Sequence, residues 1–155
     1  MATHEIVIIG IGNILRSDDG LGFHIIKELQ KYNLPPDVKL VERDVLDFQI
    51  LSVMENARKV IFVDAIQNKG KPGKIYYLDL TQVNMESAKD LRIPNIHNLE
   101  LEKFLLFCKI MGVSPPKILL IGCEPKNLEM GLELSKEVRE AIPKIINLIL
   151  KELEG

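Results

Sequence analysis

Aromatic residues are scarce in this sequence, and basic residues do not outnumber acidic ones. It contains no tryptophan, and aromatic residues make up only 5% of its 155 positions. Single-stranded nucleic acids stack on aromatic side chains, so this scarcity argues against a base-stacking surface. The net charge is −2, which is not the basic balance of a nucleic-acid-binding protein. We therefore expect no nucleic-acid partner.

Cysteines and long apolar runs are also few. The two cysteines, Cys108 and Cys123, show neither the spacing of a metal site nor a disulfide framework. No apolar run approaches the roughly 20 residues that a membrane helix needs, and the first residues lack the apolar core of a signal peptide. These absences predict a cytoplasmic protein without membrane insertion. With 46% hydrophobic and 27% charged residues, residues 1–155 are expected to form a single domain.

Strand and helix patterns alternate along the chain. Three apolar runs, at 5–10, 59–65 and 117–122, are typical of strands buried on both faces of a sheet. Further strands are predicted at 38–42 and 73–80, and helices at 20–32, 47–56, 98–112 and 135–153. This alternation predicts an α/β sandwich with a mainly parallel sheet. The third and fourth strands are joined by too few residues for a helical crossover, so the fourth should run antiparallel.

The stretch GIGNILRSDDGLG, residues 10–22, follows the first strand. It begins like a dinucleotide-binding loop, but that fingerprint needs a third glycine where this chain has Leu15. Asp18 and Asp19 place negative charge where a phosphate would bind. Two like charges about 4 Å apart cost about 4 kcal/mol at an effective dielectric constant of about 20, whereas a helix N-terminus returns only about 0.3–1 kcal/mol. We therefore expect the loop to face a cation, although Ser17 or Asp18 could simply cap the following helix.

Two residues elsewhere in the chain could join this loop. Asp64 ends the third strand, and in open α/β sheets ligands bind outside the carboxyl ends of strands where the strand order reverses. A turn role for Asp64, bonded to its own backbone, stays open. Among the histidines, His4 precedes the first strand and His24 is expected to be solvated on the first helix. His97 lies on a predicted loop before a helix and could reach a crevice at the sheet edge.

Asp19, Asp64 and His97 would form a ligand set of two carboxylates and one imidazole. Such a set suits first-row divalent metals and leaves coordination positions open, unlike a structural zinc site with four ligands. Cys123 could instead pair with His97 as thiol and imidazole. A lone cysteine at a strand end is more often a packing residue, so the metal-facing set is the favoured hypothesis.

The stretch GNILRSDDGLG resembles the signature of the [NiFe]-hydrogenase maturation endopeptidases. The matching positions are a Gly-Asn pair, a leucine, an acidic pair and spaced glycines: Gly12, Asn13, Leu15, Asp18, Asp19, Gly20 and Gly22. Asp64 in VDAI and His97 before a helix match the family's second carboxylate and its histidine. The later segments GCEP and LELS are also similar, and the resemblance runs along essentially the whole chain in the same element order.

The resemblance implies a fold, an activity and a substrate. The fold would be a three-layer α/β/α sandwich of the phosphorylase/hydrolase-like type, with a mixed five-stranded sheet in the order 2-1-3-5-4 and strand 4 antiparallel. The activity would be endopeptidase removal of the C-terminal extension of a hydrogenase large-subunit precursor after nickel insertion. Asp19, Asp64 and His97 would contact this nickel, which the substrate carries, and no organic cofactor is implied.

The sequence departs from the family pattern in two places. Glu42-Arg43-Asp44 stands where Asp-Gly-Gly is usual, and Glu133 stands where glycine is common. Glycine permits backbone geometry that other residues resist. The altered loop leaves open a nickel-dependent binding or chaperone module that does not cut, and the fold leaves open a hydrolase with its own bound metal. The main hypothesis is cleavage by a metal-polarised water, with Asp19 the first candidate for the base.

Overall fold

The computed structural model describes residues 5–81 and 99–154. The strands in this part of the chain are β1 (Ile6–Ile11), β2 (Val38–Arg43), β3 (Lys59–Ala65), β4 (Ile75–Asp79) and β5 (Lys117–Cys123). The helices are the 3-10 helix η1 (Ser17–Gly20) and the α-helices α1 (Leu21–Leu29), α2 (Phe48–Met54), α4 (Leu99–Ile110) and α5 (Lys136–Glu154).

The five strands form one mixed sheet in the order β2-β1-β3-β5-β4. Three neighbouring pairs are parallel, and β4 runs antiparallel to β5. The predicted strand order and the antiparallel fourth strand are therefore confirmed. The antiparallel direction follows from the short connection between β3 and β4, which leaves no length for a crossover helix.

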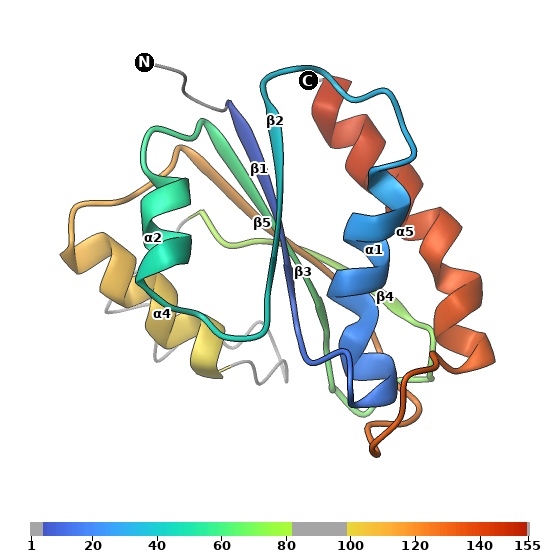
Figure 1. Ribbon diagram of the computed structural model, residues 1–155. Helices are drawn as coiled ribbons and strands as arrows, with labels where there is room; N and C mark the ends of the chain where they lie inside the picture. Colours follow the sequence, from blue (N-terminus) through green and yellow to red (C-terminus); the bar gives the residue numbers. More distant parts are fainter. Residues whose placement is uncertain (1–4, 82–98, 155) are drawn as a thin grey trace.

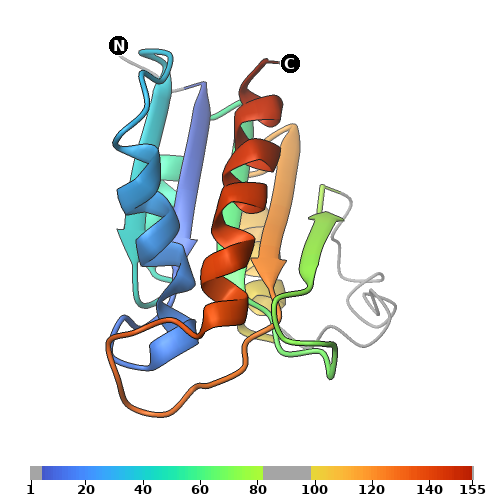
Figure 2. The ribbon, with the colours of Figure 1, turned by 90° about the vertical axis from the view of Figure 1, so that its right-hand side faces the viewer.

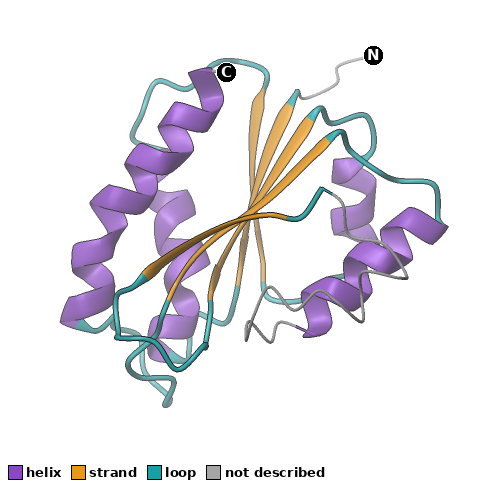
Figure 3. Cartoon of the chain, turned by 180° about the vertical axis from the view of Figure 1, so that it is seen from behind, coloured by secondary structure: helices purple, strands orange, loops and turns teal. Residues whose placement is uncertain are grey.

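Helices cover both faces of the sheet and make three layers. Helices α2 and α4 lie on one face, and α1 and α5 lie on the other (Figures 1 and 3). Because successive strand residues point to opposite faces, Val7 and Ile9 pack in the core under α2 and α4, whereas Ile6 and Ile8 pack in the core under α1 and α5. Strand β1 is buried along its whole length, as its unbroken apolar run predicts.

The start of the first helix differs from the prediction. Helix α1 begins at Leu21, after the short helix η1, and its N-cap is Gly20 with no side-chain capping bond. The expectation that Ser17 or Asp18 caps this helix is therefore wrong. Both side chains are buried and are bonded to a different part of the chain. Helix α2, by contrast, is capped by Asp47, whose side chain accepts hydrogen bonds from the second and third residues of the helix.

The carboxyl ends of β1, β3 and β5 meet at one edge of the sheet. Strand β1 lies between β2 and β3, so the chain crosses to opposite sides of β1 after its first two strands. This is the point of an open α/β sheet where a crevice forms. Among the described residues, no helix is both long and apolar enough to cross a bilayer.

Candidate functional site

A small crevice opens at the carboxyl edge of the sheet. Its volume is about 240 Å³, and it is bounded by residues from the ends of β1, β3 and β5: Arg16, Asp19, Ala65, Ile66, Gln67, Pro125 and Leu128. Three segments that are distant in the sequence therefore meet there. The crevice lies at the switch point between β1 and β3, where the strand pattern predicts a ligand site.

Gly12 lies close to both the backbone of Asp19 and the side chain of Asp64. It has φ of 141°, and a Cβ at this position would lie 1.9 Å from the carbonyl oxygen of Asp19 and 3.7 Å from Oδ1 of Asp64. Only glycine fits such an approach, because any side chain would overlap the backbone of η1. The glycine thus lets the loop after β1 fold back beside the end of β3.

Asp19 is half-buried and also organises its own loop. Its Oδ2 accepts a hydrogen bond from the backbone N–H of Asn13 at 2.9 Å. The side chain of Asn13 in turn accepts a bond from the N–H of Leu15 at 2.9 Å. These bonds close the turn between β1 and η1. They use one carboxylate oxygen of Asp19 and orient the group at the crevice wall.

Asp18 has a different role from its neighbour, which sequence reasoning missed. It is fully buried, and its carboxylate accepts hydrogen bonds from the backbone N–H groups of Lys126, Asn127 and Ser135 and from the Ser135 hydroxyl. These donors lie on residues 124–135, here called the return loop, which joins β5 to α5. In Figure 2 the return loop passes beneath η1 and the start of α1. The buried charge is therefore stabilised by four donors, as a buried carboxylate requires.

Residues 12–20, here called the signature loop, are joined to the return loop by further bonds. Arg16 and Gly131 form an isolated parallel bridge. The N–H of Ser17 donates to the carbonyl of Gly131 at 2.8 Å, and its hydroxyl donates to the carbonyl of Glu129 at 2.8 Å. Ser17 has φ of 52°, a left-handed conformation that costs a non-glycine residue free energy. The hydrogen bonds between the two loops offset the free-energy cost of this conformation.

A second buried carboxylate, Glu124, was also missed. It is 3% exposed and accepts hydrogen bonds from the N–H groups of Asn68 and Gly70 and from the hydroxyl of Tyr76 at 2.6 Å. Burial, followed by the contact with Glu124, raises the pKa of Tyr76 to about 12. Glu124 fixes the segment that follows β3, and Ile66 and Gln67 of that segment line the crevice. The GCEP segment carried this residue, but a single glutamate after a strand gives no signal of burial.

The histidine predictions have mixed outcomes. His97 and His4 lie outside the described residues, so the full set of Asp19, Asp64 and His97 stays a prediction. No cluster of three metal-binding side chains occurs within residues 5–81 and 99–154. The expectation that His24 is solvated is wrong, because its Nε2 is buried without a hydrogen-bond partner and burial lowers its pKa.

Cys123 has the environment of a packing residue. It is fully buried in the core under α1 and α5. Burial, followed by the negative charges of Asp18 and Glu124, raises the pKa of the Cys123 thiol to about 12. A thiolate is the nucleophilic form of cysteine, so this environment disfavours the alternative thiol–imidazole pair.

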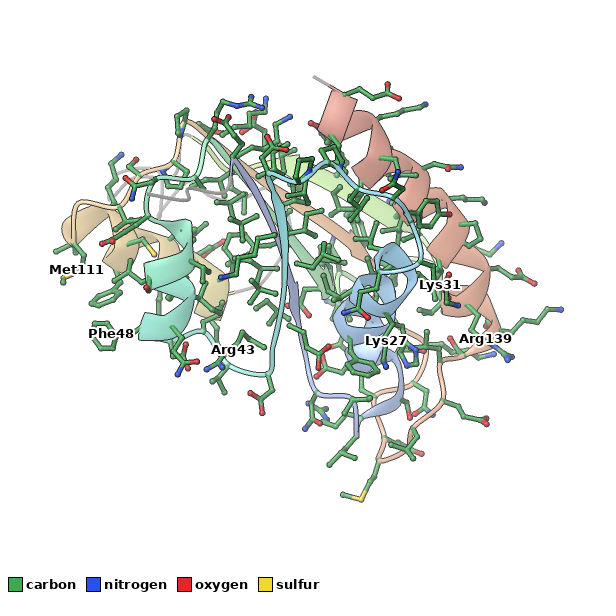
Figure 4. The ribbon with its side chains drawn as sticks, turned by 45° about the horizontal axis from the view of Figure 1, so that its top comes forward. Lys27, Lys31, Arg43, Phe48, Met111 and Arg139 are labelled. Carbon is green, nitrogen blue, oxygen red and sulfur yellow. The ribbon has the colours of Figure 1, made fainter. Side chains whose placement is uncertain are left out.

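The Glu42-Arg43-Asp44 segment adopts ordinary backbone geometry. None of its three residues has positive φ in the structure, so no glycine conformation is required there. Arg43 forms an ion pair with Asp47, the capping residue of α2. Figure 4 shows Arg43 between the end of β2 and the start of α2. The segment therefore has a side-chain contact where the family pattern has glycine, and none of its three residues lines the crevice.

Comparisons with known proteins agree with this fold. Residues 23–152 match the family described as Hydrogenase maturation protease. The chain is 29% identical to the hydrogenase 2 maturation protease of Escherichia coli, over 96% of this chain and 90% of the relative. It is 32% identical to the coenzyme F420 hydrogenase subunit delta of Methanothermobacter thermautotrophicus, over 96% of this chain and 94% of the relative.

Solved structures are similar over the same length. The hydrogenase maturating endopeptidase HybD from E. coli superposes with a TM-score of 0.81 at 29% identity, covering 96% of this chain and 91% of that chain. A hydrogenase 2 maturation peptidase from a Thaumarchaeota archaeon has a TM-score of 0.71 at 32% identity, covering 96% and 97%. The fold is thus a three-layer α/β/α sandwich, and the maturation proteases named above are hydrolases. The chain belongs to the hydrogenase maturation protease family, whose members are endopeptidases.

Proposed function

We propose that this protein removes the C-terminal extension of a [NiFe]-hydrogenase large-subunit precursor after nickel has been inserted. The observation that supports this proposal is the close approach of two segments at Gly12, where the backbone of Asp19 and the side chain of Asp64 both lie near the glycine. Asp19 and Asp64 therefore lie at the same edge of the sheet, and Asp19 lines the crevice there. Oxygen ligands on separate segments suit a divalent cation and leave positions open for ligands that arrive with it.

In this proposal the nickel belongs to the substrate. Asp19, Asp64 and His97 contact it, and the precursor supplies the remaining ligands. Three ligands on separate segments make a weak site for a free ion, because ordering the segments uses part of the binding energy. The protease then distinguishes loaded from empty precursor by a difference in affinity.

The chemical step is hydrolysis of one peptide bond. A water molecule beside the metal loses a proton to a carboxylate and adds to the scissile carbonyl carbon. The carbon–nitrogen bond then breaks, and the leaving nitrogen takes up the proton. Asp19 is the proposed base, because one of its oxygens is held by Asn13 while the carboxylate still faces the crevice.

The test uses metal-stripped enzyme with nickel-loaded and nickel-free precursor in metal-free buffer. We expect the shortened product from the loaded precursor alone. Equal cutting of both forms would refute nickel as the recognition signal. A need to reload the enzyme with zinc would favour a hydrolase with its own metal, and tight binding without cutting would favour a chaperone module.

Variants of the three proposed ligands extend the test. Asp19→Asn keeps an acceptor for the N–H of Asn13, so its fold should survive while processing is lost. Asp64→Asn and His97→Ala should also lose processing. Asp37→Asn is the matched control, because Asp37 precedes β2 at the opposite edge of the sheet. Full activity in any of the three variants would remove that residue from the proposed site.

A further inference from the structure

Arg16 stands out among the residues of the crevice because of its charge. It lines the crevice together with Asp19, and it lies in the signature loop directly before η1. A guanidinium beside a cation site opposes the binding of that cation. Its presence there therefore suggests that another part of the bound substrate offers oxygen acceptors.

The position of the Arg16 side chain is set by the return loop. Its Nε donates to the carbonyl of Leu128 at 3.3 Å, and Leu128 also lines the crevice. The bridge between Arg16 and Gly131 holds the backbone on the same loop. These contacts use one of the five guanidinium donors. The side chain is thus held by the hydrogen bond of its Nε, and this bond does not involve the two terminal nitrogens.

The terminal nitrogens have no partner within residues 5–81 and 99–154. Arg16 is exposed and forms no ion pair with a carboxylate in this part of the chain, although Asp19 lines the same crevice. Arginine presents a planar fork that binds paired oxygens. A peptide that enters a crevice offers main-chain carbonyl oxygens on both sides of the bond to be cut.

We infer that Arg16 is a substrate-binding residue that donates hydrogen bonds to main-chain carbonyl oxygens of the precursor segment beside its nickel. The inference rests on the proposed function and deepens it. The carboxylates recognise the metal, and Arg16 recognises the peptide that carries it. The negative groups of the site then bind the metal, and the positive group binds the peptide oxygens beside it.

The test compares Arg16→Gln with the wild-type protein. Glutamine retains an N–H donor at the position of Nε, so it can keep the bond to Leu128 while losing the charged fork. Arg16→Lys keeps the charge without the fork. Arg139→Gln is the matched control, because Arg139 is exposed and projects from α5 (Figure 4).

Two quantities are measured: the Kd for fluorescently labelled nickel-loaded precursor, and the KM and kcat of cleavage. Arg16→Gln should raise Kd and KM about 10- to 100-fold, as expected for a lost charge-assisted hydrogen bond. The value of kcat should change less, because the contact exists in the ground state. The Kd and KM of Arg16→Lys should lie between those of the wild-type protein and those of Arg16→Gln. The values for Arg139→Gln should match the wild type.

Three outcomes would overturn the inference. The first is an unchanged Kd and KM in Arg16→Gln. The second is a rise in Kd that occurs only with a lower midpoint of thermal unfolding, which would assign Arg16 to the structure of the return loop. The third is an equal rise in Arg139→Gln. A wild-type protein that binds precursor without cutting it would refute the proposed activity, while the Kd comparison would still decide the role of Arg16.

Discussion

The two sides of the sheet's carboxyl edge are built differently. On the β3 and β5 side, buried Asp18 and Glu124 bind backbone N–H groups and hold the signature and return loops around the crevice. On the β2 side, the segment 43–48 is held by a partly exposed ion pair between Arg43 and Asp47 and by the capping hydrogen bonds that Asp47 accepts from the start of α2. The side that lines the candidate crevice is thus the side with the buried carboxylates and their hydrogen bonds, as expected where reacting groups must be held in a defined geometry.

The β2 side also exposes apolar surface. Val45 is 53% exposed and Phe48 is 67% exposed. Phe48 lies at the start of α2 and points outward in Figure 4. A groove of about 550 Å³ runs there between α2 and α4, with Phe104 and Phe107 in its lining. Substitutions on this side should therefore cost less stability than substitutions of the buried carboxylates.

The largest expected effect is at Asp18. Asp18→Ala removes the acceptor of three backbone N–H groups and one hydroxyl, and each unsatisfied buried donor costs about 1–3 kcal/mol. We expect the free energy of unfolding to fall by about 3 kcal/mol or more, measured by urea denaturation. Asp19→Asn is the control from the same pair and should lose less than about 1 kcal/mol. Equal losses would contradict the division of roles between the two aspartates.

The next effect is at Glu124. Glu124→Ala leaves the N–H groups of Asn68 and Gly70 and the hydroxyl of Tyr76 without their acceptor. A loss of about 2 kcal/mol is expected in the same measurement. A double-mutant cycle with Tyr76→Phe should give a coupling energy of about 1 kcal/mol. A coupling near zero would show that the hydrogen bond between Tyr76 and Glu124 contributes nothing to stability.

A smaller effect should appear at high pH. The pKa of Tyr76 is about 12 in the folded protein, against 10.0 for an ordinary tyrosine. The folded state therefore favours the neutral phenol, so its contribution is complete below pH about 10 and is lost as the pH rises through about 12. We expect this group to account for about 1–2 kcal/mol of lost stability over that interval. Tyr76→Phe should make this part of the curve less steep without removing the loss, because the pKa of Tyr77 is also raised to about 12. An unchanged curve in that variant would assign the whole loss to other groups.

The smallest effect is expected at Phe48. Its ring meets Phe107 edge-to-face with centroids 5.5 Å apart, and such a pair contributes about 0.5–1.5 kcal/mol. Because Phe48 is largely exposed, Phe48→Ser should cost less than about 1 kcal/mol in thermal melts. Phe104→Ser is the buried counterpart at 7% exposure and should cost about 3 kcal/mol. Similar costs at both positions would mean that the β2 side is as firmly packed as the core.

The sequence alone determined the fold of this protein. Unbroken apolar runs in 59–65 and 117–122 identified central strands, and the short link before β4 identified its antiparallel direction. These features can be predicted from the sequence because burial on both faces produces a continuous apolar run, and because the length of a connection is given directly by the number of residues in it. The candidate residues Asp19 and Asp64 were also named from strand ends and from the resemblance, and His97 from a loop outside the described residues.

Only the tertiary structure revealed what Asp18 does. Asp18 and Asp19 are adjacent and chemically identical. The resemblance names Asp19 as a metal contact, whereas the sequence offers Asp18 only a role as a helix cap, which the structure shows to be wrong. Their difference comes from the return loop, more than a hundred positions away, whose N–H groups close around Asp18 alone. The environments of Glu124 and Arg16 also depend on the tertiary structure, because each side chain is bonded to a backbone group of another loop at the sheet edge. Local patterns do not encode such contacts, because the donors are main-chain groups that every residue type carries.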